Sequence, residues 1–577
     1  MNYPLDFMRR SSRSGIRNIE PFQTLFDGGN RLRINWEVNR IRFERMRREL
    51  RHSESGRSMT TSTMSNVPKL LKRFGLSPVH SRTSAFLICA GLATTFLHGC
   101  GQGASERPAF PPAGSSESEA GKTVFPGVTL KVASPEDPAL GAVTADLVGE
   151  WRASRQAEVE VVELPKPADG KLADIPADID VLLVRGDRLG ELVDRDMIEK
   201  LGDLDADWAT RPPAFEETVS RYGPDRYAVP IGTSALVLAY REDAFASPET
   251  KAELEKAGVN FPPATWDEFD KLVALLAARS PQPIAVPTLR GPNDDLPLDI
   301  LLARATAAGK HRDYFSFLMG LDEATPRIAT PPFAESLAKI VKWRGKPGEK
   351  VSPDDARAAF RQGQASLLID YAENAPAWSE TGGTAKIGVA PLPGATLVFD
   401  PDRREYVKTS PPNLSAWLPR GGGYVAVLNK GRSGKQAEAA RDFLKYIAGD
   451  ATAPQWAADS RMRMLPTRDA VLAQGFVDPR FAPKVNGGAW GEAILKQIGS
   501  PNYVVGLRVP DARTLLDSVG KAVEAAFQGS PAEKTLAEAD EAWKKTVAAY
   551  GPLRMKWHYG RSLVKPLTDS EAPPPGK

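Results

Sequence analysis

Charged side chains follow two runs that predict strands, at the points where those runs end. Glu136 and Asp137 come after the β-rich run TLKVAS at 129–134, and Arg185 and Asp187 come after the apolar run DVLLV at 180–184. Carboxylate and guanidinium groups form bidentate hydrogen bonds, which suits them to adjacent hydroxyl groups. These four residues could therefore bind a ligand with neighbouring hydroxyls, although each could equally be a solvated turn residue.

The elements that carry these side chains alternate along the chain. A helical segment at 139–155 and a second predicted strand, EVEVVEL at 158–164, separate the two apolar runs. This succession predicts parallel strands in a sheet that is covered on both faces. Because ligands of such sheets bind beyond the carboxyl ends of the strands, we expect the four side chains to lie at one binding edge.

Three further acids, Asp294, Asp295 and Asp299, cluster in the sequence NDDLPLD. Paired acids can bind a metal or act as general acid and base. No histidine or third spaced ligand accompanies them, which favours a solvated loop or a helix N-terminus.

Signatures of histidine- and cysteine-dependent enzymes are missing from the sequence. After residue 100 the only histidines are His311 and His558, no cysteine follows Cys100, and neither G-x-S-x-G nor H-E-x-x-H occurs. A carboxylate-dependent glycosidase stays open, because paired acids leave no local signature. A surface protein that only binds partners stays open too.

Length and composition allow two substantial cores. The chain has 577 residues, of which 42% are hydrophobic and 25% charged. Its formal net charge is only +3, and the basic excess lies in the Arg-rich residues 1–58. The overall charge therefore predicts no binding to nucleic acid.

A central stretch at 227–278 combines a strand pattern with a helix start. The residues at 235–240 form a short apolar run, and Pro230 and Gly232 precede it. Thr265 and Glu268 have the spacing of a capping box, and apolar residues then recur at helical spacing.

This order resembles that of the family 1 extracellular solute-binding proteins, the sugar-binding receptors of ABC importers. In the central stretch the matching residues are Tyr240, Asp243, Phe245, Pro262, Thr265, Trp266, Glu268 and Phe269, with Arg241 where the family usually has Asn. Further matches are Phe360, Gly363, Ala365 and Leu367, the sequence KIGVAPLPG at 386–394, and two helical segments at 436–448 and 532–550.

The resemblance implies an α/β, periplasmic-binding-protein-like fold of two lobes. Each lobe would hold a mostly parallel sheet flanked by helices, and hinge segments near 231–234, near 389–393 and after Gly449 would join the lobes. We expect the first lobe to comprise 123–232 and 392–450, and the second 233–391 and 451–550. The polar residues at 399–419 are expected to form an inserted loop, and 551–577 a polar tail.

The resemblance also implies a ligand site in the cleft between the lobes, where aromatic rings stack on sugars. Tyr424 or Trp417 would be the ring beside the glycines at 421–423, and Trp378 and Trp490 would either face the ligand or pack in a core. The expected binding residues are Glu136, Asp137, Arg185, Asp187, Thr233, Ser234, Tyr240, Asp370, Tyr371, Trp378, Gly422, Gly423, Tyr424 and Trp490.

The family's usual role is to close around a small ligand without altering it and to deliver it to the membrane subunits of an ABC importer. We accordingly expect a monomer that binds a sugar and needs no cofactor or metal. Polyamines, phosphonates and metal chelates remain possible ligands, because related receptors change ligand by changing a few loop residues.

The first 100 residues predict export. Residues 1–58 are either a wrongly assigned start, with Met59 or Met64 as the true one, or a basic cytoplasmic arm. Residues 59–100 read as a signal peptide with the apolar core SAFLICAGLATTFL at 84–97. Its end, Leu97-His98-Gly99-Cys100, resembles a bacterial lipobox except for His98.

Lipidated Cys100 would anchor the protein to a membrane in the periplasm or at the cell surface. Residues 101–122 are rich in Gly, Pro, Ser and Glu and predict a flexible tether. Cys89 lies within the signal, so the exported body can have no internal disulfide.

Overall fold

A computed structural model describes residues 123–564, with gaps at 165–171, 173, 203, 205–210, 281, 345–347, 380–385, 415, 460 and 474–486. The expected extension at 1–58, the signal at 59–100, lipidated Cys100 and the tether at 101–122 all lie outside the described residues. In the described part of the chain, no helix is long and apolar enough to cross a membrane.

The first sheet contains the two strands that carry the charged loops. Its strand order is β2 (Glu158–Val162), β1 (Thr129–Ala133), β3 (Val181–Arg185), β14 (Tyr424–Leu428) and β6 (Ala228–Gly232). β1 pairs parallel with β2 and β3, whereas β14 runs antiparallel to β3 and β6. Strands β1 and β3 are therefore neighbours with the same direction, as their sequence patterns predict.

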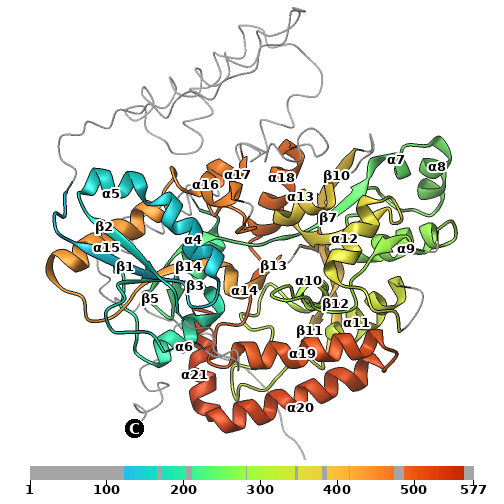
Figure 1. The fold of residues 1–577 in the computed structure, drawn as a ribbon. Coiled ribbons are helices and arrows are strands. Elements are labelled where there is room, and N and C mark those ends of the chain that lie inside the picture. Colours follow the sequence, from blue (N-terminus) through green and yellow to red (C-terminus); the bar gives the residue numbers. More distant parts are fainter. Residues whose placement is uncertain are drawn as a thin grey trace, which may run out of the picture. The chain divides into compact units, whose positions relative to one another are not determined.

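Helices α4 (Pro138–Leu147), α5 (Gly149–Arg155) and α15 (Gly434–Ile447) lie around this sheet (Figure 1). The fully buried ring of Trp151 on α5 packs edge-to-face against Phe443 on α15, with ring centres 5.2 Å apart. Its indole N–H donates to Asp442 at 2.8 Å. This contact joins the two helices over one apolar core.

The second sheet has the strand order β10 (Ile387–Pro391), β7 (Leu236–Arg241), β9 (Leu367–Tyr371) and β8 (Ile284–Ala285). β7 runs antiparallel to β10 and β9, and only β8 and β9 are parallel. The prediction of an α/β fold with two sheets is confirmed, but neither sheet is mostly parallel: the first has two parallel and two antiparallel pairings, and the second has one parallel pairing. The second sheet is mixed because the chain passes from β6 of the first sheet into β7, and β7 then runs antiparallel to both of its neighbours.

Helices form most of the body around the second sheet. They are α7 (Glu242–Phe245), α8 (Pro248–Lys256), α9 (Trp266–Ala277), α10 (Leu296–Gly309), α11 (Pro331–Trp343), α12 (Pro353–Arg361), α13 (Ala375–Ser379), α18 (Gly487–Ile498), α19 (Ala512–Phe527) and α20 (Ala532–Tyr550). The predicted capping box of α9 is present: Thr265 accepts from the Glu268 amide at 3.2 Å, and Glu268 accepts from the Thr265 amide at 3.1 Å.

The chain passes between the two sheets at several points. One passage is 233–235, between β6 and β7, where Thr233 forms a bridge with Leu465 of a later segment. Another passage is the short helix α14 (Pro419–Gly422), which leads into β14. Val389, which we expected near a hinge, lies inside β10.

The predicted inserted loop at 399–419 forms most of a hairpin. Its strands are β11 (Ala395–Asp400) and β12 (Glu405–Asn413), and β11 packs against α10 beside the second sheet. Asn413 donates to the Ala307 carbonyl of α10 at 2.7 Å. The return to the first sheet therefore comes at α14, later than the predicted crossing near 389–393.

Helix α21 (Pro552–Ser562) begins the segment whose composition predicts a polar tail. The hydroxyl of Tyr559 accepts from the backbone amides of Phe317, Leu318 and Met319 at 3.2–3.3 Å. The buried His558 lies 2.8 Å from the Tyr222 hydroxyl and 2.9 Å from Asp194.

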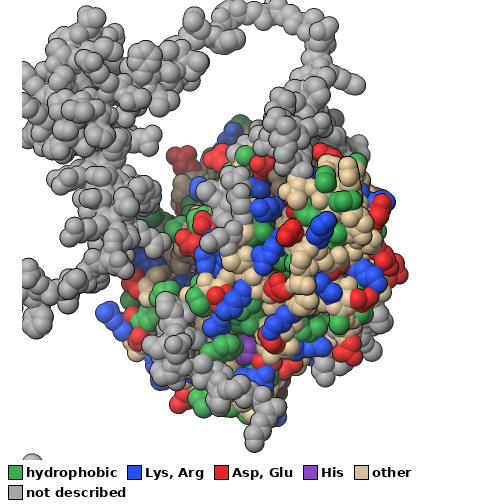
Figure 2. All heavy atoms as spheres, turned by 90° about the vertical axis from the view of Figure 1, so that its left-hand side faces the viewer, with side chains coloured by type: hydrophobic (Ala, Val, Ile, Leu, Met, Phe, Trp, Pro, Cys, Tyr) green, Lys and Arg blue, Asp and Glu red, His purple; other side chains and the backbone are tan. Residues whose placement is uncertain are grey.

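Figure 2 shows the side of the molecule on which the first sheet lies. On this side, acidic and basic side chains are interspersed rather than gathered by sign.

Candidate functional site

A cavity of about 520 Å³ lies between the loop after β3 of the first sheet and helix α10, which packs against β9 of the second sheet. The loop after β3 supplies Arg185, Asp187 and Arg188. The side of the second sheet supplies Arg290, Asp295, Leu298, Asp299, Trp417 and Arg420. The start of α19 contributes Asp511, Arg513, Thr514 and Asp517, and the end of α20 contributes Tyr550. Helix α6 (Leu189–Asp194) and the residue after it contribute Glu191, Asp194 and Arg195. We call this cavity the cleft.

The wall from the first sheet joins the two charged loops that the sequence singles out. Arg185 donates to Asp187 at 2.5 Å, and both side chains are buried. Arg188 donates from Nε to Glu136 at 2.7 Å, and this contact ties the loop after β3 to the loop after β1. The Tyr424 hydroxyl donates to Asp137 at 2.9 Å. The structure therefore brings these expected binding residues together at one sheet edge.

The wall from the second sheet is built around Asp299 on α10. The hydroxyl of Tyr371, at the end of β9, donates to one carboxylate oxygen, and the indole N–H of Trp417 donates to the other at 2.8 Å. All three side chains are buried. Two rings and a carboxyl group thus form a fixed unit, of which Asp299 and Trp417 line the cleft.

Arg420 occupies the passage between the sheets. Its guanidinium carbon lies 5.5 Å from the centre of the Tyr371 ring, which is a cation–π contact. Its backbone has φ +55°, in the left-handed region that a non-glycine residue seldom adopts. The neighbouring Gly421 permits a close approach, because a Cβ there would lie 2.1 Å from the Asp187 amide nitrogen. This conformation carries Arg420 to the cleft beside the loop after β3.

Burial changes the titration of two carboxyl groups on the second wall. Burial raises the pKa of Asp299 to about 7, and the charge of Asp295 adds to this rise. Burial likewise raises the pKa of Glu373, which follows β9, to about 7. Near neutral pH both groups are therefore partly protonated.

Stability should depend on pH through Asp299. The folded chain keeps this proton up to about pH 7, whereas the unfolded chain loses it near the ordinary pKa of about 4. The free energy of unfolding should therefore fall by about 1.4 kcal/mol per pH unit for this group as the pH rises from 5 to 7. Urea unfolding of the wild type and Asp299→Asn at each pH measures the difference, and a difference that is constant with pH would contradict the assignment.

Four other expected binding residues lie away from the cleft. Trp378 is completely buried on α13 against Phe360, and Trp490 is buried on α18. Asp370 is buried in an ion pair with Arg357. Tyr240 packs against Phe245 and Phe261 at the end of β7 remote from the passage at 233–235. Our proposal for the site leaves these four residues out.

The remaining four expected residues form the passage between the sheets. Thr233 and Ser234 are buried, and the Thr233 hydroxyl donates to the carbonyl of Gly422 at 3.0 Å. A Cβ on Gly423 would lie 2.2 Å from the carbonyl oxygen of Gly232. Gly423 is needed because two backbones meet there, and Gly422 because the Val219 side chain leaves no room for a Cβ. None of the four residues lines the cleft.

Asp299, Arg420 and Arg513 are among the cleft residues that sequence reasoning does not select. The sequence favours a solvated acidic cluster at Asp299, although its place on the first turn of an apolar helix is a usable signal. Arg420 and Arg513 carry no local signal at all, since only the packing of the sheets and α19 brings them to the cleft.

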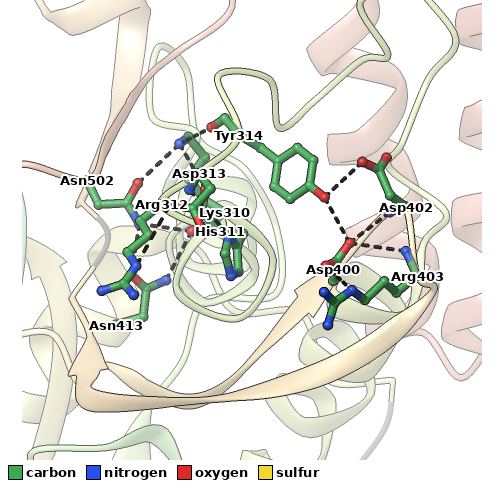
Figure 3. Close-up of polar contacts among 10 residues, drawn as sticks. All are labelled: Lys310, His311, Arg312, Asp313, Tyr314, Asp400, Asp402, Arg403, Asn413 and Asn502. Atoms are coloured by element: carbon green, nitrogen blue, oxygen red, sulfur yellow. Dashed lines mark hydrogen bonds and ion pairs between the residues drawn. The ribbon is translucent and has the colours of Figure 1, made fainter. Parts of the chain in front are cut away.

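A second polar cluster holds the β11–β12 hairpin in place (Figure 3). The ammonium group of Lys310 donates to Asn502 at 3.1 Å and to the carbonyl oxygens of His311 and Tyr314. The Tyr314 hydroxyl donates toward Asp400 and Asp402, at 3.0 and 2.8 Å. These polar groups satisfy one another across three segments, which indicates a structural role.

Metal binding finds no support in the described ranges, where no group of three or more His, Cys, Asp or Glu side chains could hold an ion. The acids of the cleft are instead held by arginine, tyrosine and tryptophan side chains.

Two facing α/β sheets, joined by crossing segments and separated by a polar cleft with aromatic rings, define a two-lobed binding protein. Residues 168–454 match the family model described as bacterial extracellular solute-binding protein. This part of the chain therefore belongs to that family, as its motifs predict. No curated protein sequence matches the chain.

Solved structures share the fold. A solute-binding protein of an ABC transporter from Agrobacterium radiobacter K84, in complex with ribitol, has a TM-score of 0.50 and 19% identity over 74% of this chain and 100% of that chain. The cyclic alpha-maltosyl-1,6-maltose binding protein from Arthrobacter globiformis has a TM-score of 0.52 and 17% identity over 73% of this chain and 99% of that chain.

Proposed function

We propose that this solute-binding protein captures a carbohydrate in the cleft by closing its two lobes, and that it delivers the ligand to an ABC importer. The observation that carries the proposal is the unit of Tyr371, Asp299 and Trp417, which faces Arg185 and Asp187 across the cavity of about 520 Å³. Rings and bidentate polar groups are the combination that binds polyols. The ribitol and maltosyl ligands of the structural relatives support the same class.

The proposed lobes follow the two sheets. The expected division, 123–232 with 392–450 against 233–391 with 451–550, agrees with the passage at 233–235. We place the return at 419–423 instead of 392, since β11 packs on α10. Met462 and Met464 pack in the apolar core of the first sheet, so we also move 451–464 to the first lobe. Ligand binding would favour the closed arrangement of the lobes.

The protein is proposed to bind its ligand without a reaction. His558 is buried, with both ring nitrogens engaged by Tyr222 and Asp194, so it is unsuited to act on a ligand in the cleft. We further propose that the chain is exported, anchored through lipidated Cys100 and monomeric, with importer membrane subunits as its partners. The motif at 97–100 supports the anchor.

Thermal-shift screening against a panel of sugars and sugar alcohols tests the proposed site. A ligand at 100 times its Kd should add about 2.7 kcal/mol of stability. Thr514→Trp, which fills the cleft from the exposed face of α19, should abolish that shift. Ala537→Trp, at an exposed position of α20 outside the cleft lining, should preserve it.

Three results would contradict the proposal. Turnover of a bound sugar would favour the glycosidase alternative, and a panel without any hit would favour a surface interaction protein. A shift that survives Thr514→Trp would place the ligand elsewhere.

A further inference from the structure

The carboxyl groups of the cleft are mostly engaged by the protein itself. Asp187 is paired with Arg185, and Asp517 is paired with Arg290 and Lys521. Glu191 is paired with Arg188 and Arg195, and Asp194 with Arg554 and His558. Asp295 lies 3.9 Å from Arg290, Asp299 accepts from two neutral donors, and Asp511 is exposed. The cleft therefore offers a ligand little free negative charge.

Two guanidinium groups of the cleft lack such a partner. Among the described residues, Arg420 donates one hydrogen bond, to the carbonyl of Asn293 at 3.3 Å, and neither Arg420 nor Arg513 pairs with a carboxylate. Both side chains are partly buried. An arginine carries five N–H donors in a planar fork, so most of the donors of these two residues are left for a ligand or water.

Arg185 adds a third positive charge between them. Its positive charge is the largest cause that lowers the pKa of Arg513, so these guanidinium groups lie close enough to repel each other. Arg185 is buried, and its Nε has no hydrogen-bond partner in the described part of the chain. Among the described residues, Asp187 is the one carboxylate that pairs with any of the three guanidinium groups. Glu136 acts on Arg185 and Arg513, and Asp299 and Glu373 act on Arg420, without forming an ion pair. An anion placed among them would relieve this repulsion and fill the open donors.

We infer that the ligand of the cleft is an acidic carbohydrate, whose oxyanion binds Arg420 and Arg513 beside Arg185 while its hydroxyls meet Asp187 and the Tyr371–Asp299–Trp417 unit. This inference rests on the proposed function and narrows its ligand class. The buried Oδ1 of Asp187 has no hydrogen-bond partner in the described ranges. It suits a sugar hydroxyl, which can donate a hydrogen bond to it, whereas a ligand carboxylate would be repelled. A uronate and a sugar phosphate both supply the required oxyanion.

Calorimetric titrations can compare matched sugars. The probes are D-glucuronate and D-galacturonate, the neutral D-glucose and D-galactose, and D-glucose 6-phosphate as the phosphate source. The wild type should bind at least one acidic sugar at least tenfold more tightly than its neutral counterpart. Arg420→Gln and Arg513→Gln should each lower the affinity for that acidic sugar at least tenfold. Each should lower the affinity for the neutral sugar less than threefold.

Arg312→Gln is the matched control, since it removes the same charge from an exposed position outside the cleft lining. It should change neither affinity, and melting curves confirm that each variant folds. Equal affinity for acidic and neutral sugars, or an unchanged preference in both cleft variants, would overturn the inference and leave the proposed function intact. If none of the acidic and neutral sugars binds, both the inference and the proposed function would be overturned.

Discussion

Trp378→Ala is expected to lower the free energy of unfolding by about 3–5 kcal/mol, because it empties a fully buried site. The ring packs edge-to-face against Phe360 with centres 6.3 Å apart, in the same core as Ala356 and Leu368. Urea unfolding of the variant measures the loss.

Trp378→Phe is the matched control. The indole N–H is buried without a hydrogen-bond partner among the described residues, so the phenylalanine loses no hydrogen bond and fills most of the space. Its cost should stay below about 2 kcal/mol. Unchanged stability in Trp378→Ala together with a large loss of ligand affinity would move this ring from the core to the site.

Arg357→Ala is expected to cost about 3–5 kcal/mol, because it leaves the buried carboxylate of Asp370 without its counter-ion. Arg357 holds both oxygens of Asp370, at 2.6 and 2.9 Å, and it also reaches Asp294 at 2.9 Å. Its side chain is 3% exposed and that of Asp370 is fully buried. Chemical unfolding at neutral pH measures the loss.

The double variant Arg357→Met with Asp370→Asn separates pairing from packing. It removes both charges and keeps the volume close to the original, so it should recover a large part of the stability lost in Arg357→Ala. Removal of an exposed ion pair costs less than about 1 kcal/mol. If Arg357→Ala lowers the free energy of unfolding by no more than that, groups other than Arg357 stabilise the carboxylate of Asp370.

The elements of the fold were largely predictable, because local rules agree with the final structure. The capping box of Thr265 and Glu268 starts α9 as its spacing indicates, and the run at 532–550 forms α20. Helix α21 was missed because its segment is polar overall. Met555 and Tyr559, four residues apart and both buried, were the signal that could have revealed it.

The site was predictable only at the edge of the first sheet. The loops after β1 and β3 meet because neighbouring parallel strands end together, which a strand pattern can show. Trp378 and Trp490 are buried, and the sequence left both interpretations open because a core tryptophan and a ligand-binding tryptophan look alike there. Arg420 depends on a left-handed backbone and on glycines that let two segments approach, and neither feature can be read from residue types alone.

The central claim is that a carbohydrate binds in the cleft between the sheets, and calorimetric titration tests it most directly. With a sugar that stabilises the wild type, we expect one ligand per chain, the same affinity in Ala537→Trp, and no measurable heat of binding in Thr514→Trp. Unchanged binding in Thr514→Trp, with the variant folded, would contradict the account.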